Sequence, residues 1–256
     1  EVLLVYGAHL GVAGSAWGTV VAQVVAAALF VQVSRRKLTS AVSRPGRGEY
    51  AVLVRNGVAL VIRTIALGAA LTASTAIAAR VGPTTLGGHQ IGLQVWILLA
   101  LTLDALAVPA QVYVGTALGR GDRDDAARIG RRCLRLGLVA SAVVGVTTMV
   151  LSPVLPYIFT GDSGVRSHAV VALLICGALQ PFAAIAFVLD GLLLGAAAYA
   201  ALRRSMLLAL LAFAPLAVAT LLDHRLGIVG IWLAITCWLA ARCALLGRAW
   251  FRLLPG

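Results

Sequence analysis

The chain has 256 residues, of which 61% are hydrophobic and only 12% are charged, and its mean hydropathy is +0.98. This leaves too little polar surface to cover a soluble globule, so the composition predicts an integral membrane protein. The net charge of +12 would suit nucleic acid in a soluble domain, but the arginines stand in short clusters between apolar runs. That pattern is typical of membrane topology signals, and we expect no nucleic-acid partner.

Apolar runs long enough to cross a bilayer recur along the chain and predict an all-α, polytopic transmembrane bundle. Residues 1–6 are apolar but too short to span, and the chain begins with Glu, so we expect the C-terminal piece of a longer protein. The predicted spans are 12–33, 52–79, 86–115, 133–158, 168–195 and 204–249, the last divided into two helices by Asp223, His224 and Arg225.

Basic residues alternate between the two sides of this bundle. Sixteen Lys and Arg fall in one set of alternate loops and three in the other, Arg80, Arg166 and Arg225. Because Lys and Arg are retained on the cytoplasmic side, the richer set predicts the cytoplasmic face. We therefore expect a multi-pass protein of the inner (plasma) membrane with a cytoplasmic C-terminus.

Two short segments open apolar helices in the same way. LGVAGSAW begins at Leu10 and LGIVGIW at Leu226, an offset of 216 residues. An internal repeat of several spans indicates a two-lobe transporter. We expect residues 1–33 to end the N-terminal lobe with the tail of helix five and helix six, 34–50 to be a cytoplasmic linker, and 51–252 to be the C-terminal six-helix lobe.

Three ionisable residues lie at membrane depth, where each costs about 2.5 to 3.5 kcal/mol and usually faces the bundle interior. Asp104 lies about 27 Å and Arg63 about 24 Å from the outer ends of their helices, so we expect them to face each other. The pair is either a static packing contact or part of ion coupling or gating. Asp190 lies nearer the cytoplasmic end, where snorkelling or capping is expected.

Neutral polar residues and prolines within the spans are candidates for a cavity or hinge. A glutamine supplies hydrogen-bonding groups for a substrate or a neighbouring helix, and a proline permits a bend. His89 is expected to be solvated at the outer face. The chain shows no catalytic motif, and its four cysteines lack metal-ligand spacing, so we expect neither an enzyme nor a metal site. The cavity or hinge candidates are Gln90, Gln94, Gln111, Gln180, Pro109 and Pro181.

The succession of several segments resembles the multidrug and toxic compound extrusion (MATE) family, and within it the DNA-damage-inducible (DinF) branch. The resemblance runs from the end of helix five through helix twelve. The segments are GVAGSAWGTVVAQ at 11–23, IRT at 62–64, ARVGPTTLGGHQIGLQVW at 79–96, LDALAVPAQVYVG at 103–115 and FVLDGLLLG at 187–195.

The resemblance implies a V-shaped, twelve-helix exporter of cationic or amphipathic xenobiotics that exchanges them for protons or sodium and needs no other cofactor. Its partners would be the small-molecule substrate, the bilayer and the N-terminal lobe of the same protein. That lobe's first helix carries the proton-binding carboxylate of this branch. Here Arg63 occupies helix seven instead of an acid, and alanines follow Gly195, which argues against sodium binding by this lobe.

Two other functions fit parts of the pattern. A flippase for lipid or polysaccharide precursors shares the two-lobe architecture but should line its cavity with several cations, and Arg63 alone is available for that role. A non-transporting membrane scaffold would need neither the charges at membrane depth nor the prolines within spans.

Overall fold

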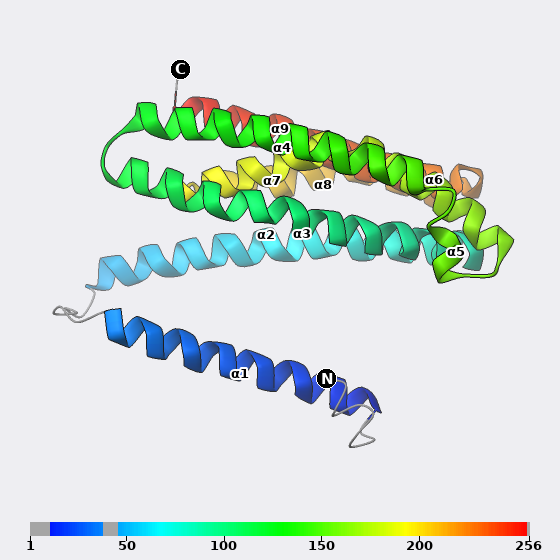
Figure 1. The fold of residues 1–256 in the computed structure, drawn as a ribbon, viewed down its shortest axis with the longest axis horizontal. Helices are drawn as coiled ribbons and strands as arrows, with labels where there is room; N and C mark the ends of the chain where they lie inside the picture. The colour runs from blue at the N-terminus through cyan, green and yellow to red at the C-terminus, as the bar shows by residue number, and fades with distance from the viewer. Residues whose placement is uncertain (1–10, 38–45, 255–256) are drawn as a thin grey trace. The chain divides into compact units, whose positions relative to one another are not determined.

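The computed structural model describes residues 11–37 and 46–254, which are helical with short turns (Figure 1). One unit includes α1, and the residues from Val52 onward form a second, compact unit. The helices are α1 (Gly11–Lys37), α2 (Arg47–Val81), α3 (Pro83–Gly119), α4 (Arg123–Leu151), α5 (Pro156–Phe159), α6 (Ser163–Ala178), α7 (Gln180–Gly195), α8 (Tyr199–Leu222) and α9 (Gly227–Leu253), with a 3₁₀ turn at His224–Leu226.

The predicted spans are confirmed in number. Among the described residues six helices are long and apolar enough to cross a membrane, and the bent pair α6 and α7 makes a seventh span. The predicted start at residue 133 was ten residues late, because the arginine-rich segment before it already belongs to α4. Asp122 caps that earlier start, its side chain accepting a hydrogen bond from the Asp125 N–H at 2.8 Å.

The span predicted at 168–195 is a broken helix. Its halves α6 and α7 meet at an angle of 53°. Pro181 stands in the first turn of α7, where a missing N–H costs no helical hydrogen bond, but it cannot continue the ladder from α6. The expected bend at Pro181 is therefore present.

Small residues let α3 and α7 lie very close together. A Cβ added at Gly191 or Gly195 would collide with the backbone carbonyl of Ala107 or Gln111 on α3. The two glycines are four residues apart and so share one face of α7, a spacing that permits close helix approach in membranes. The backbone of α3 is thereby held directly against α7, the helix that carries Asp190.

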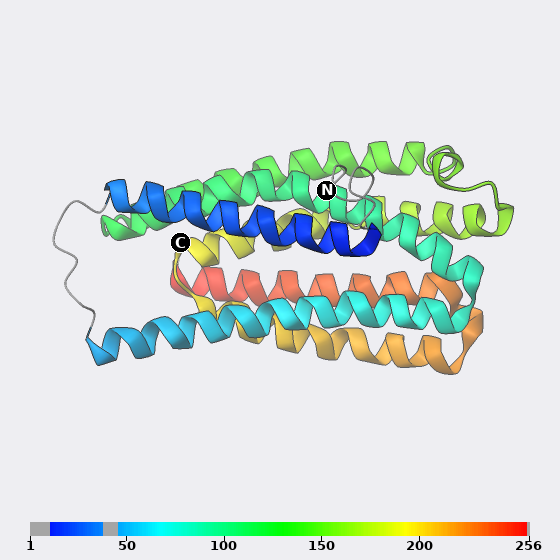
Figure 2. The ribbon, with the colours of Figure 1, turned by 90° about the horizontal axis from the view of Figure 1, so that it is seen from below.

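Helices that are distant in the sequence pack together in the second unit. Figure 2 shows the axes of α2, α8 and α9 running in nearly the same direction, and α8 and α9 pack as an antiparallel pair. The core between the helices contains fully buried large side chains such as Trp232 and Trp238. This packing brings side chains from α2, α7 and α9 within reach of each other.

The two copies of the repeated segment share a backbone feature. Gly11 at the start of α1 has φ +53°, and Gly227 at the start of α9 has φ +47°. Residues with a side chain rarely adopt this left-handed backbone conformation, which explains why a glycine stands at both positions. The repeat recognised in the sequence therefore extends to the local geometry by which each helix begins.

Candidate functional site: a buried charge cluster beside a polar helix face

Two arginines converge on a single carboxylate inside the bundle. Arg63 Nη2 on α2 donates to Asp190 Oδ2 on α7 at 2.7 Å, and Arg242 Nη2 on α9 donates to the same oxygen. The side chains of Asp190 and Arg242 are 8% and 3% exposed, and that of Arg63 is 20% exposed. The Arg242 guanidinium also lies over the Trp238 ring, 5.0 Å from its centroid. We call Arg63, Asp190 and Arg242 the charge cluster.

The expected pair of Arg63 and Asp104 was wrong, as was the capping role for Asp190. Arg63 bonds to Asp190, which is buried, whereas Asp104 is exposed and makes no ion pair with a described residue. Asp104 nevertheless lies close enough to interact electrostatically with Arg63 and Asp190. The pairing was expected from similar predicted depths, but depth does not determine which face of a helix meets its neighbour.

Arg242 was missed by the sequence analysis. It lies within the 27-residue apolar helix α9, six positions before the arginine assigned to the cytoplasmic end. The signal was available, since Arg63 and Arg242 are the two basic residues outside every predicted loop. A basic side chain within a span needs a counter-charge, and Asp190 supplies it.

One face of α3 carries most of the predicted polar candidates. At 3.6 residues per turn, four of them fall within roughly 100° of the helix circumference. Gln90 is half-buried, and the other three are exposed in this chain. This polar face, defined as Gln90, Gln94, Asp104 and Gln111, is interleaved with exposed apolar residues such as Leu101 and Val108.

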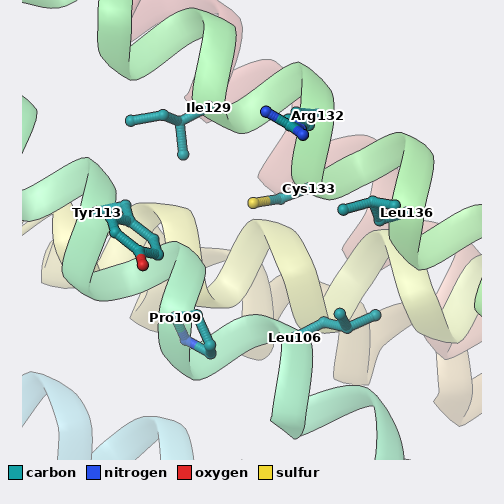
Figure 3. A pocket seen from close by; sticks show the side chains of 7 residues that line it. All are labelled: Leu106, Pro109, Tyr113, Ile129, Arg132, Cys133 and Leu136. Atoms are coloured by element: carbon teal, nitrogen blue, oxygen red, sulfur yellow. The ribbon is translucent and has the colours of Figure 1, made fainter.

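The remaining cavity and hinge candidates lie elsewhere. Gln180 is buried at the break between α6 and α7, where its amide nitrogen donates to the Cys176 carbonyl at 3.1 Å and its amide oxygen has no partner among the described residues. Pro109 lines a largely apolar pocket of about 410 Å³ between α3 and α4 (Figure 3). Tyr113 from α3 and Cys133 and Arg132 from α4 are among the residues that line this pocket. The charge cluster does not line it.

The expectation that His89 is solvated was also wrong. His89 is fully buried, with Nε2 3.3 Å from the Ser74 hydroxyl of α2 and its ring edge-on to Trp232 of α9, centroids 6.0 Å apart. Its helix begins at Pro83, so His89 is nearly two turns inside rather than at the start. It links α2, α3 and α9 at the end of the bundle away from the C-terminus.

The titratable side chains do not form a metal centre in the described part of the chain. No group of three or more His, Cys, Asp or Glu is placed there to hold a metal ion. Asp190, the buried carboxylate, already accepts from two guanidinium groups. The arrangement favours electrostatic positioning of helices over ligation of a metal.

Several membrane-length helices joined by buried charges define a polytopic helical membrane protein. The chain belongs to the MATE family, because the MatE family model matches residues 60–219. It is 28% identical over 182 residues to Protein DETOXIFICATION 44, chloroplastic, of Arabidopsis thaliana, covering 71% of this chain and 35% of that protein.

Two further comparisons agree with this family. The chain is 37% identical over 98 residues to the probable multidrug resistance protein NorM of Rhodopseudomonas palustris (strain ATCC BAA-98 / CGA009), covering 37% of this chain and 21% of that protein. An outward-facing multidrug resistance MATE family transporter has the same fold, with a TM-score of 0.84 at 15% identity, over 98% of this chain and 58% of that one. The chain thus spans well under half the length of the two curated relatives, DETOXIFICATION 44 and NorM.

Proposed function

We propose that the protein is a secondary active efflux transporter that exports small organic compounds in exchange for protons or sodium by alternating access. We place it in the DinF-like branch, in the plasma membrane with its C-terminus cytoplasmic. The residues from 51 to 252 would act as one lobe that moves against a second. The observation that carries this proposal is Asp104, an uncommitted carboxylate at membrane depth beside a buried charge cluster.

Asp104 would face the cavity between the lobes. An ionised side chain in lipid costs about 2.5 to 3.5 kcal/mol, so an exposed carboxylate at this depth requires water or a polar neighbour. The glutamines on the same face of α3 supply hydrogen-bonding groups suited to such a cavity. The apolar residues between them would contact the hydrophobic part of an amphipathic substrate.

The charge cluster would couple ion binding to movement of the lobe. Two arginines, Asp190 and ionised Asp104 sum to zero, whereas a proton on Asp104 leaves a net charge of +1. Asp190 ties α2, α7 and α9 together and already accepts from two guanidinium groups, so it would hold the lobe rigid. Asp104 would carry the coupling ion.

Exchange would follow from competition at one carboxylate. A cationic substrate and the coupling ion are both attracted to Asp104, and each would displace the other. The preference for cationic or amphipathic xenobiotics rests on this competition and on the multidrug resistance named for the NorM relative. Both arginines of the cluster are ion-paired with Asp190, which offsets part of the positive charge that the pyrophosphate of a flippase substrate would need.

Efflux from everted vesicles containing the full-length protein tests this function. Ethidium or rhodamine transport would be measured with a proton gradient or a sodium gradient imposed separately. Transport driven by one gradient would support the proposal and identify the ion. Absence of transport under both would contradict it, and binding of lipid-linked precursors in the same vesicles would then favour the flippase.

A further inference from the structure

A second polar site lies at the end of the bundle that holds the C-terminus of α9. A cavity of about 480 Å³ opens there between α2, the turn from α7 to α8, and α9. Figure 2 shows these segments together at that end. Four arginines and Asn56 line it, and no acidic residue does. We call Arg55, Arg203, Arg204 and Arg252 the arginine pocket.

These arginines have no counter-charge in the structure. Every ion pair in the described ranges 11–37 and 46–254 involves other arginines. Four like charges around one cavity repel each other, and an anion in the cavity would relieve that repulsion. The cavity is therefore suited to an anionic group.

The start of α8 adds backbone donors to the arginine pocket. α8 begins at Tyr199 and no side chain caps its first N–H groups. Helix N-termini attract anions through these free N–H groups and the helix dipole. The lining turn consists of alanines, so only methyl groups stand between a ligand and the backbone, and Ala197 is held at φ +53°.

We propose that the arginine pocket binds the phosphate headgroup of an anionic phospholipid from the cytoplasmic leaflet. Basic pockets between transmembrane helices on the cytoplasmic side are suited to such headgroups. Exposed apolar side chains continue along α2 and α8 deeper into the membrane and would contact the acyl chains: Val58, Val61, Leu207 and Leu211. A free phosphate ion would gain the arginines and the N–H groups but not this apolar path. The site is independent of the transported substrate.

Native mass spectrometry of the full-length protein in detergent tests the lipid site. Phosphatidylglycerol, phosphatidylcholine and inorganic phosphate would be titrated in turn onto the delipidated protein. We expect phosphatidylglycerol to bind at least tenfold more tightly than either of the others. The R203Q/R204Q variant should lose about fivefold in affinity for each arginine removed.

A matched control keeps the test specific. The R123Q/R131Q variant removes two exposed arginines from α4 at the same end of the bundle and should retain the lipid. Ala200→Phe fills the cavity without a charge change and should release the lipid while the protein stays folded. Equal loss in R203Q/R204Q and R123Q/R131Q, or equal affinity for phosphatidylglycerol and inorganic phosphate, would overturn the proposal.

Discussion

Arg63 and Asp190 are 127 positions apart in the sequence, yet the guanidinium Nη2 of one lies 2.7 Å from the carboxylate Oδ2 of the other. Arg242 donates to the same oxygen. Three helices are therefore joined at one buried atom, at membrane depth. The first two predictions concern what happens when this charge balance is changed.

Asp190→Asn removes the ion-pair partner of two guanidinium groups in the interior. Removing one partner of a buried pair typically costs about 3 to 5 kcal/mol, and we expect a loss of that size. Thermal unfolding in detergent measures it, with Asp124→Asn, an exposed acid on α4, as a control that should stay within about 0.5 kcal/mol. Unfolding midpoints that agree between the two variants would show that the charge cluster does not stabilise the lobe.

Replacing the whole charge cluster should restore stability lost in the single variant. Packed apolar residues often replace buried ion pairs without a loss of stability. The triple variant should therefore unfold at a higher temperature than Asp190→Asn; it combines Arg63→Met, Asp190→Leu and Arg242→Met. The same unfolding assay compares them. A triple variant less stable than the single one would mean that the cluster's hydrogen bonds, rather than charge compensation, hold the helices.

Asp104→Asn should separate transport from stability. The side chain is exposed and has no ion pair among the described residues, so we expect a free energy of unfolding within about 0.5 kcal/mol of that of the parent protein. Gradient-driven efflux in everted vesicles should be abolished or lose its ion dependence. Asp124→Asn, an exposed acid outside the polar face, should retain coupling. Retained coupling in Asp104→Asn would remove Asp104 from the mechanism.

His89→Ala should destabilise the end of the bundle opposite the arginine pocket. The variant loses the contact with the Ser74 hydroxyl and opens a cavity against Trp232, which together should cost about 2 to 4 kcal/mol. His224→Ala, at an exposed position in the turn between α8 and α9, should change the free energy of unfolding by less than about 0.5 kcal/mol. Similar losses in both variants would show that burial of His89 does not matter.

Two glycine-to-alanine substitutions should change the free energy of unfolding in opposite directions. Gly191→Ala places a methyl group against the Ala107 carbonyl and should cost about 1 to 3 kcal/mol by separating α3 from α7. Gly57→Ala meets no atom within 4 Å and should stabilise α2 by about 0.5 to 1 kcal/mol. Calorimetric unfolding of the two variants in the same detergent measures both effects, and a gain of stability in Gly191→Ala would refute the close α3–α7 packing.

Much of the architecture was predictable because a bilayer imposes length and polarity on each span. Apolar runs determine how many times the chain can cross, and Gly11 and Gly227 mark equivalent helix starts. The boundaries were less accurate at α4, where arginines near the membrane surface continue the helix instead of ending it. Proline permits the bend at Pro181 but does not by itself determine it, since Pro109 lies inside the continuous helix α3.

The sequence by itself determined the class of protein and the number of spans, since both follow from hydrophobicity counted along one helix at a time. Only the tertiary structure decided which charges meet. Arg63 and Asp104 have similar predicted depth, but the rotation of the helices about their axes turns Arg63 and Arg242 toward Asp190 and leaves Asp104 exposed. That rotation is set by side-chain packing, including the contact of Gly191 with α3, between residues that no local pattern brings together.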